Sequence, residues 1–167
     1  MFEDSKTASN IRMHRTKCTN VVKNVLGPHF EALLREDVCD QKYSFQIDES
    51  TDISLINVLG IVIRYFFLSS FEVVSTFLDL QELQQCNAEA IASALLDGLR
   101  AKGLKPENLV GVGVDNASVM TGVNSCVYTR LRQDLSHLVM VQCVFHSVQL
   151  AVSLASSCLP RNVEFLV

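Results

Sequence analysis

The stretch YSFQIDESTD, residues 43–52, passes from strand-forming residues into a polar run that carries three carboxylates. Its first half, residues 43–48, has the composition and alternation of a short β-strand. Asp48 closes this strand, and the alternation directs its side chain to the face opposite that of Ile47. A carboxylate at the end of a strand suits a metal site, a turn cap or a solvated turn. The rest of the chain has to distinguish these interpretations.

The remaining segments predict an α/β fold with a mixed sheet. A helix over residues 9–34, with a break near Gly27-Pro28, precedes the first strand. Two more strands complete an antiparallel three-strand meander, and helix, strand, helix, strand and helix follow, with helices packed on the faces of the sheet. These elements are predicted at residues 58–68, 73–83, 88–103, 109–115, 118–135, 138–145 and 146–158. Asn87 is expected to cap the first of these helices and Gly103 to end it.

Composition limits the function classes. The 167 residues suffice for one domain with a buried core, and no apolar run reaches the roughly 20 residues of a membrane span. The N-terminus has no secretion signal, and the six cysteines are expected to be free thiols, which favours a nuclear or cytoplasmic protein. The net charge of −4 predicts weak DNA binding at most.

Two aspartates end predicted strands, Asp48 the first and Asp115 the fourth. If these strands are neighbours, the two carboxylates meet at one edge of the sheet, where α/β proteins bind ligands. Oxygen ligands with no soft donor beside them suit Mg²⁺ or Mn²⁺, and paired carboxylates hold two such ions for phosphoryl transfer. Alternatively, Asp48 caps a turn and Asp115 caps the helix that starts near Ser118. The residues alone leave both interpretations open.

Three blocks resemble the signature blocks of hAT-superfamily DNA transposases: IDESTD (47–52), GVGVDNASVMTG (111–122) and CVFHSVQLA (143–151). The resemblance covers residues 15–158 and implies a ribonuclease H-like fold, the order of whose elements agrees with the pattern above. It implies that Asp48 and Asp115 descend from the first two catalytic metal ligands. In the third block it implies that Cys143 and His146 form the family's Cys-x-x-His motif, with His146 in a supporting role near the acidic pair.

The chain also departs from this family's pattern. It has no Cys-x-x-Cys pair for the DNA-binding zinc finger, and Glu164 lies too close behind the third block to stand for the third acidic residue. The expected organisation is a helical lead-in (1–40), a partial core (41–158) truncated before the helical insertion and final helix, and a tail (159–167). We therefore expect an incomplete catalytic core without strand cleavage of its own, which acts, if at all, as an interaction or regulatory remnant. The alternative is an active metal-dependent nuclease or transposase core that another chain or a longer isoform completes.

Several side chains carry secondary expectations. Cys143 and His146 are half a zinc site that Cys126 or Cys158 could complete, but the spacings follow no standard pattern and no structural zinc is expected. Asn116 and Ser118 are expected to cap a helix, Gly122 to permit close packing on the sheet, and Glu49 and Asp52 to support the acidic pair or cap a turn. An exposed apolar face of the sheet predicts self-association or a protein partner, without membrane binding.

Overall fold

The computed structural model describes residues 13–51, 56–122 and 125–158, without the side chain of Thr51. Asp52 and the predicted tail over residues 159–167 lie outside this part of the chain. The chain divides into two compact units, Met1–Asp37 and Val38–Val167.

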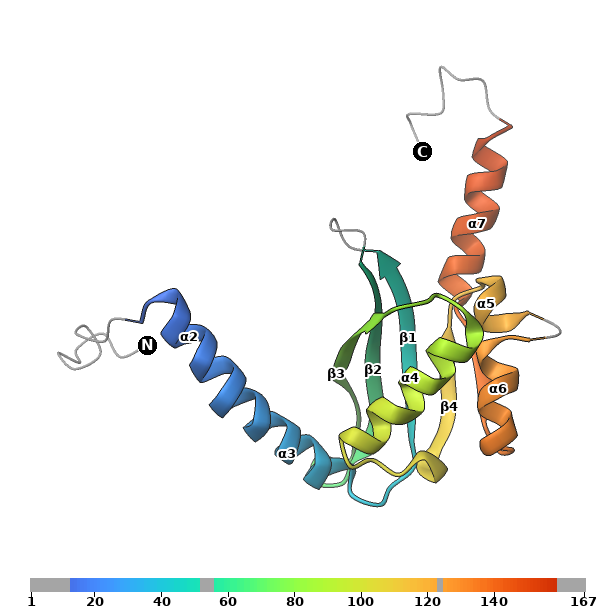
Figure 1. The fold of residues 1–167 in the computed structure, drawn as a ribbon. Coiled ribbons are helices and arrows are strands. Elements are labelled where there is room, and N and C mark those ends of the chain that lie inside the picture. The colour runs from blue at the N-terminus through green and yellow to red at the C-terminus, as the bar shows by residue number, and fades with distance from the viewer. Residues whose placement is uncertain (1–12, 52–55, 123–124, 159–167) are drawn as a thin grey trace. The chain divides into compact units, whose positions relative to one another are not determined.

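The N-terminal unit is helical. It contains α2 (Arg15–Val21), a π-helical turn η1 (Val22–Leu26) and α3 (Gly27–Val38), whose last residue belongs to the second unit (Figure 1). The predicted break near Gly27-Pro28 is wrong, because the helix continues through both residues. A proline removes one amide donor and crowds the carbonyl four residues earlier. The π-helical turn, which widens the hydrogen-bond ladder directly before Pro28, accommodates this without ending the helix.

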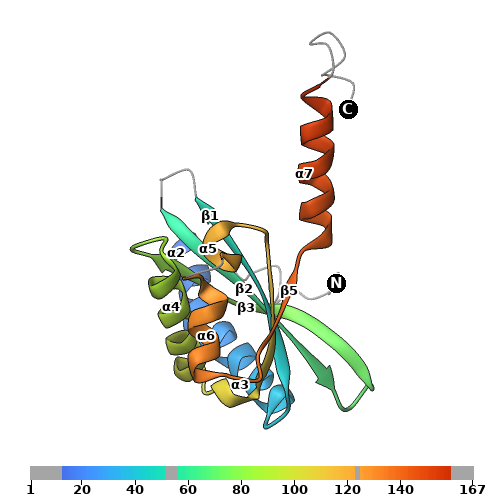
Figure 2. The same ribbon diagram turned by 90° about the vertical axis from the view of Figure 1, so that its right-hand side faces the viewer.

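The second unit is built on a five-stranded mixed sheet with the strand order β3-β2-β1-β4-β5. The first three strands form an antiparallel meander, and β4 and β5 run parallel to β1 (Figures 1 and 2). The strands are β1 (Tyr43–Thr51), β2 (Asn57–Phe67), β3 (Glu72–Leu83), β4 (Leu109–Val114) and β5 (Val139–Gln142). The predicted fold class, an α/β domain with a ribonuclease H-like mixed sheet, is confirmed.

One face of this sheet forms the core. Alternate side chains of β1 and β2 are buried, among them Phe45, Ile47, Ile61 and Ile63. Helices α4 (Ala88–Ala101) and α6 (Val127–Asp134) cover this face (Figure 2). The side chains that alternate with these buried ones point to the other face of the sheet, and Gln46 and Asp48 of β1 are exposed there.

Helix α4 begins at Ala88 as predicted and ends at Ala101, two residues before the predicted end at Gly103. The Asn87 side chain accepts a hydrogen bond from the Ala90 amide at 2.8 Å, which confirms the N-cap. At the other end Gly103 adopts a φ of 72°, and the amides of Gly103 and Leu104 donate to Arg100 and Leu99. This is the Schellman arrangement, in which a left-handed glycine lets the chain leave the helix.

An Asn87→Ala substitution is expected to lower the free energy of unfolding by about 1 kcal/mol, because the Ala90 amide loses its acceptor. Urea denaturation followed by circular dichroism measures the change. Asn87→Asp keeps an acceptor oxygen at the same place and should retain most of the stability. Equal losses in the two variants would rule out the cap as the cause.

Several predicted elements end elsewhere. Strand β1 continues to Thr51, past its predicted end at Asp48, and β4 ends at Val114, one residue before Asp115. The helix predicted over residues 118–135 is two helices, α5 (Ser118–Thr121) and α6, because Gly122 turns to a ψ of 155° and Cys126 starts a new helix. A Cβ on Gly122 would lie 2.6 Å from the Ser118 carbonyl oxygen, so this glycine serves the end of α5 and not packing on the sheet. The strand predicted over residues 138–145 ends at Gln142, since a short apolar run does not distinguish a strand from a helix start.

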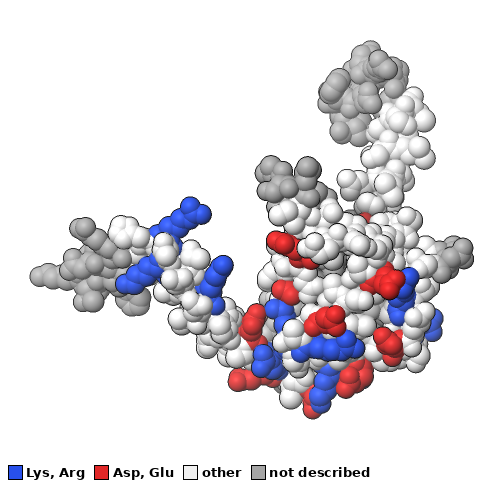
Figure 3. All heavy atoms as spheres, in the orientation of Figure 1, with Lys and Arg blue, Asp and Glu red and all other residues white. Residues whose placement is uncertain are grey.

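The last helix, α7 (Val144–Ser156), follows β5 directly and has no buried residue. It contains no charged side chain. Figure 3 shows acidic and basic side chains over the body of the second unit and only uncharged surface on α7. None of the helices in the described ranges is long and apolar enough to cross a bilayer.

Candidate metal centre

The pairing of β1 with β4 places Asp48 beside Asp115. The two strands are parallel, with Gln46 opposite Gly113; two residues later Asp48 lies within β1 and Asp115 directly follows the end of β4. Adjacent strands lie about 4.8 Å apart, so the two carboxylates leave the sheet at matching positions. Asp48 follows the buried Ile47 and therefore points to the face that α4 and α6 do not cover. The prediction that the first and fourth strands are neighbours is confirmed.

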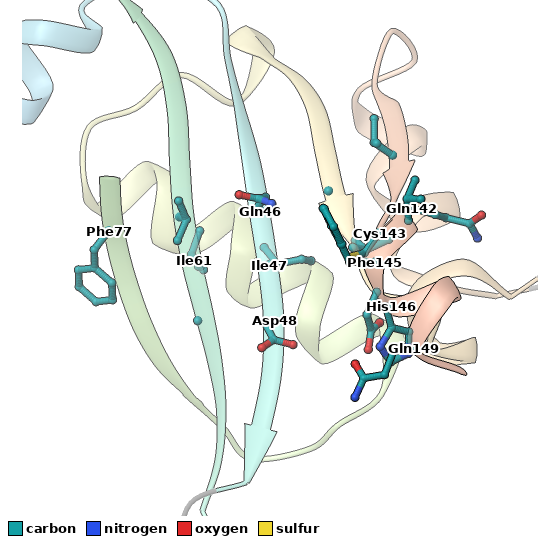
Figure 4. A pocket seen from close by; sticks show the side chains of 17 residues that line it. Gln46, Ile47, Asp48, Ile61, Phe77, Gln142, Cys143, Phe145, His146 and Gln149 are labelled. Atoms are coloured by element: carbon teal, nitrogen blue, oxygen red, sulfur yellow. The ribbon is translucent and has the colours of Figure 1, made fainter. Parts of the chain in front are cut away.

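Both aspartates line one pocket of about 740 Å³ on this open face. Two glycines of the neighbouring backbone, Gly60 and Gly113, contribute no side chain to the pocket and leave room above the strands. Figure 4 shows Asp48 on β1 facing the start of α7, where His146 and Gln149 point toward it. The polar groups of the pocket are the carboxylates and the side chains of Gln46, Gln142, His146 and Gln149. The pocket thus collects polar side chains from β1, from the ends of its parallel neighbours β4 and β5, and from the N-terminal part of α7.

The Asp115 carboxylate also shapes the turn after β4. Its Oδ1 accepts a hydrogen bond from the Ala117 amide at 3.0 Å. Asp115 is not the N-cap of the next helix, because α5 has Ala117 at its N-cap position. The turn bond occupies one oxygen of Asp115, and a carboxylate has a second oxygen for another ligand. Within residues 13–51, 56–122 and 125–158, that second oxygen makes no hydrogen bond to the protein.

Asp48 is an exposed carboxylate. No hydrogen bond or ion pair joins it to another side chain or amide in the described part of the chain, so it does not cap a turn there. Asp48 lies opposite Gly60 on the neighbouring strand, which leaves the space beside its carboxylate open on that side. The Asp48 carboxylate is therefore accessible to a cation from solvent.

His146 reaches the pocket from the first turn of α7. This turn is attached to β4 because the Cys143 amide donates to the Val114 carbonyl at 2.9 Å. The third block therefore brings His146 into the same pocket as Asp48 and Asp115. Among the described residues, no group of three or more His, Cys, Asp or Glu side chains is arranged to hold an ion. The protein donors of the candidate centre are a carboxylate pair, with an imidazole in the same pocket.

This donor set fits a hard divalent cation. Mg²⁺ keeps several of its waters and binds to proteins through one or two carboxylates, and Mn²⁺ accepts the same oxygen ligands. An open, solvated pocket with two carboxylates provides such ligands and leaves room for water or a phosphate oxygen. Asp48 and Asp115 are the residues that would hold the ion.

Other residues expected near the site have different places. Glu49 lies next to Asp48 in β1 and therefore points to the opposite face, where its hydrogen bond raises the pKa of the Cys86 thiol. Asn116 does not cap a helix, because its side-chain amide donates to the Ser147 hydroxyl of α7 at 2.7 Å. The buried Cys126 caps α6, where its sulfur accepts from the Thr129 amide at 3.5 Å.

Two pocket residues were not expected from the sequence. Gln149 lies three residues after His146 on α7, so the helical spacing could have placed both on one face. Gln46 precedes Asp48 by two residues, and strand alternation puts them on the same face. Both signals are present in the sequence, but a glutamine is so common on exposed faces that it points to no particular chemistry.

A protein-family comparison identifies the family of the chain. The model of the family DUF4371, described as "ZMYM1/FAM200, RNase-like domain", matches residues 2–125. The match covers about three quarters of the chain and includes Asp48 and Asp115, whereas the block with Cys143 and His146 lies beyond it. The chain belongs to the ZMYM1/FAM200 RNase-like domain family, and it is a transposase-derived domain with a ribonuclease H-like fold.

Proposed function

We propose that this domain is a hAT-type transposase remnant whose acidic pair binds Mg²⁺ or Mn²⁺ weakly and does not cleave DNA on its own. One observation carries the proposal: Asp48 on β1 and Asp115, directly after the end of the adjacent parallel strand β4, line one pocket. A bound ion would supply Lewis-acid polarisation of a phosphate oxygen at this place. DNA is a weak ligand in this proposal, because the chain has a net charge of −4.

The residues of the pocket explain why cleavage is not expected. Two-metal phosphoryl transfer needs enough negative charge to hold two divalent ions about 3.5–4 Å apart. The described part of the pocket offers two carboxylates, of which Asp115 already shares one oxygen with the Ala117 amide. A pair of this kind holds one ion better than two. A reacting group misplaced by about 1 Å loses on the order of a hundredfold in rate.

Titration calorimetry with Mn²⁺ tests the acidic pair. We expect weak, saturable binding to the wild-type chain and a dissociation constant at least about tenfold higher for Asp48→Ala and for Asp115→Ala. Removing one of two carboxylates beside a divalent ion removes several kcal/mol of gross electrostatic attraction. A net loss of about 1.4 kcal/mol in binding free energy is enough to raise the dissociation constant tenfold. Asp97→Ala is the matched control, because Asp97 is an exposed acidic residue of α4 that pairs with Arg100. Equal affinities in all four proteins would remove the basis of the proposal.

A nuclease assay separates the proposal from its alternative. The alternative is a metal-dependent DNA nuclease or transposase core that is completed by another chain or a longer isoform. The isolated chain with Mn²⁺ and linear duplex DNA is expected to cleave no more than Asp48→Ala. Cleavage by the wild-type chain that disappears in Asp48→Ala would favour the active core instead.

The same proposal includes an interaction surface on α7. Its apolar side chains are exposed, with Phe145 at 88% and Leu154 at 72%, and neighbouring strand β5 exposes Val139 and Val141. Four of the five polar residues of α7 form one stripe at helical spacing, namely His146, Gln149, Ser153 and Ser156. Apart from Ser147, the remaining surface of the helix is apolar, and it is uncharged. Exposed apolar surface of this kind marks an interaction site.

We assign this surface to a second copy of the chain. A helix without charge meets its own copy without repulsion, and a two-fold contact sets the same apolar positions against each other. Six exposed large side chains, at roughly 60–120 Å² each, would bury about 350–700 Å² per copy. That area lies at the lower end of specific interfaces, so the expected association is weak and depends on concentration.

The proposal places the protein in the nucleus or the cytoplasm. Its support is the state of the six cysteines, all of which are free thiols, five exposed and one buried. Free exposed thiols are typical of reducing compartments. Localisation of the epitope-tagged full chain by microscopy would test this directly.

A further inference from the structure

The turn after Asp115 is hydrogen-bonded to α7 through side chains. Asn116 Nδ2 donates to Ser147 Oγ at 2.7 Å, and Ser147 Oγ donates to the Cys143 carbonyl at 3.2 Å. A serine hydroxyl has one hydrogen, which here goes to Cys143, so the hydroxyl must accept from Asn116. This fixes the orientation of the Asn116 amide, with its NH₂ group toward α7.

A second bond anchors the same turn of α7. The Cys143 amide donates to the Val114 carbonyl at 2.9 Å. The first turn of α7 is therefore attached to the chain directly before Asp115, through Val114, and directly after it, through Asn116. His146, which lines the pocket, is the residue before Ser147 and lies between these two anchors.

Apolar packing does not replace these anchors. No residue of α7 is buried, and its large side chains are among the most exposed of the described residues. A helix without buried side chains takes its position from its covalent connection and its hydrogen bonds. The hydrogen bonds of Asn116 and Cys143 therefore orient the first turn of α7.

Asn116 fills this place at a local energetic disadvantage. Its Oδ1 is buried and has no hydrogen-bond partner among the described residues. A buried carbonyl oxygen without a partner is unfavourable, so stability alone does not favour an asparagine there. Asn116 also makes no helix cap, since Ala117 holds that position. Such a local disadvantage is typical of a position that serves a site.

We infer that Asn116 is a positioning residue, which acts through Ser147 to hold His146 beside the Asp48–Asp115 pair. The hydrogen bond joins the turn after one carboxylate to the helix that carries the imidazole, so it sets the width of the pocket between them. The consequence for a bound cation rests on the proposed function. The placement of α7 does not require a cation and is measured separately.

A matched pair of substitutions tests the link in the full chain. Ser147→Thr keeps the hydroxyl, whereas Ser147→Val has the same shape without it, and Ser147 is exposed, so both side chains fit. Asn116→Ala removes the donor from the other side. In each protein, imidazole and amide signals are recorded by NMR during titration with Mn²⁺, whose unpaired electrons broaden nearby signals. His137 is the internal control, because its Nε2 lies 3.0 Å from the Leu109 carbonyl, about 20 Å along β4 from Asp115.

In the wild-type chain and Ser147→Thr, Mn²⁺ is expected to broaden the His146 signal and the Asp48 and Asp115 amides, and to spare His137. In Ser147→Val and Asn116→Ala, the broadening of His146 should be lost while that of the two amides persists. Equal broadening of His146 in all four proteins would overturn the inference. If the hydrogen bond served folding alone, its loss would change the broadening of His146 and of the two aspartate amides alike.

The metal-free protein provides the second measurement. Heteronuclear NOE values of amides 144–149 should fall in Ser147→Val and Asn116→Ala and stay at the wild-type level in Ser147→Thr. If Mn²⁺ leaves the Asp48 and Asp115 amides sharp, the proposed cation site fails, and these values alone decide the inference. A fall confined to the two variants without the hydrogen bond supports it, and unchanged values overturn it.

Discussion

A chain with Leu154→Lys is expected to associate with a dissociation constant at least about a hundredfold higher than that of the wild-type chain. Leu154 is 72% exposed on the apolar side of α7, and burying a leucine contributes about 1.5–3 kcal/mol. In a two-fold contact the substitution occurs in both copies, so the free energy of association falls by about 3–6 kcal/mol. Burial of the two lysine charges weakens the association further. Since about 1.4 kcal/mol is a factor of ten, a hundredfold is a lower limit. Sedimentation velocity over a range of concentrations measures the effect.

The control for this variant lies one residue away. Ser153→Lys adds the same charge on the polar stripe that Ser153 shares with His146, Gln149 and Ser156, and should leave the association within a few fold of the wild type. A wild-type chain that stays monomeric at high concentration would contradict the assignment of α7 to a second copy. Equal weakening by both lysines would show that charge, and not the apolar side of α7, controls association.

An Ile63→Ala substitution is expected to lower the free energy of unfolding by about 2–5 kcal/mol. Ile63 is fully buried at 0% exposure in the central part of β2, on the face that α4 and α6 cover. Removal of its side-chain carbons loses hydrophobic transfer energy and leaves a cavity that the surrounding sheet fills only in part. The total free energy of unfolding of a domain of this size is about 5–15 kcal/mol, so this loss is a large share of it. Urea denaturation monitored by circular dichroism measures it.

The open face supplies the control for this prediction. Val73 is 58% exposed on the edge strand β3, and Val73→Ala should change the stability by less than about 0.5 kcal/mol. Ile63→Val keeps most of the buried volume and should lose about 0.5–1.5 kcal/mol. Similar losses for Val73→Ala and Ile63→Ala would mean that another part of the chain covers the open face.

The sheet and the acidic pair were predictable because each depends on local patterns. Alternation along residues 43–48 identifies β1 and the face of Asp48, and the apolar run before Asp115 identifies β4. The caps of α4 at Asn87 and Gly103 follow from the chemistry of single residues at helix ends. Such signals act within a few residues, and tertiary contacts do not override them here.

Two of the errors have different causes, one a local contact and the other a contact between distant residues. The helix predicted over 118–135 is interrupted at Gly122, where the Ser118 carbonyl leaves no room for a Cβ. Asn116 precedes a helix and is a residue type that often caps helices, but its side-chain amide donates a hydrogen bond to Ser147, 31 residues later. A partner so far along the chain leaves no local signal in the sequence.

The sequence by itself determined the order of strands and helices, the face of each strand and the identity of the two carboxylates, because burial patterns repeat with the period of each element. Only the tertiary structure decided that β1 and β4 pair in a register that sets Asp48 beside Asp115, and that α7 brings His146 to them. Register and helix placement depend on backbone hydrogen bonds and side-chain contacts between segments far apart in the chain. Those contacts form only when the whole sheet is assembled.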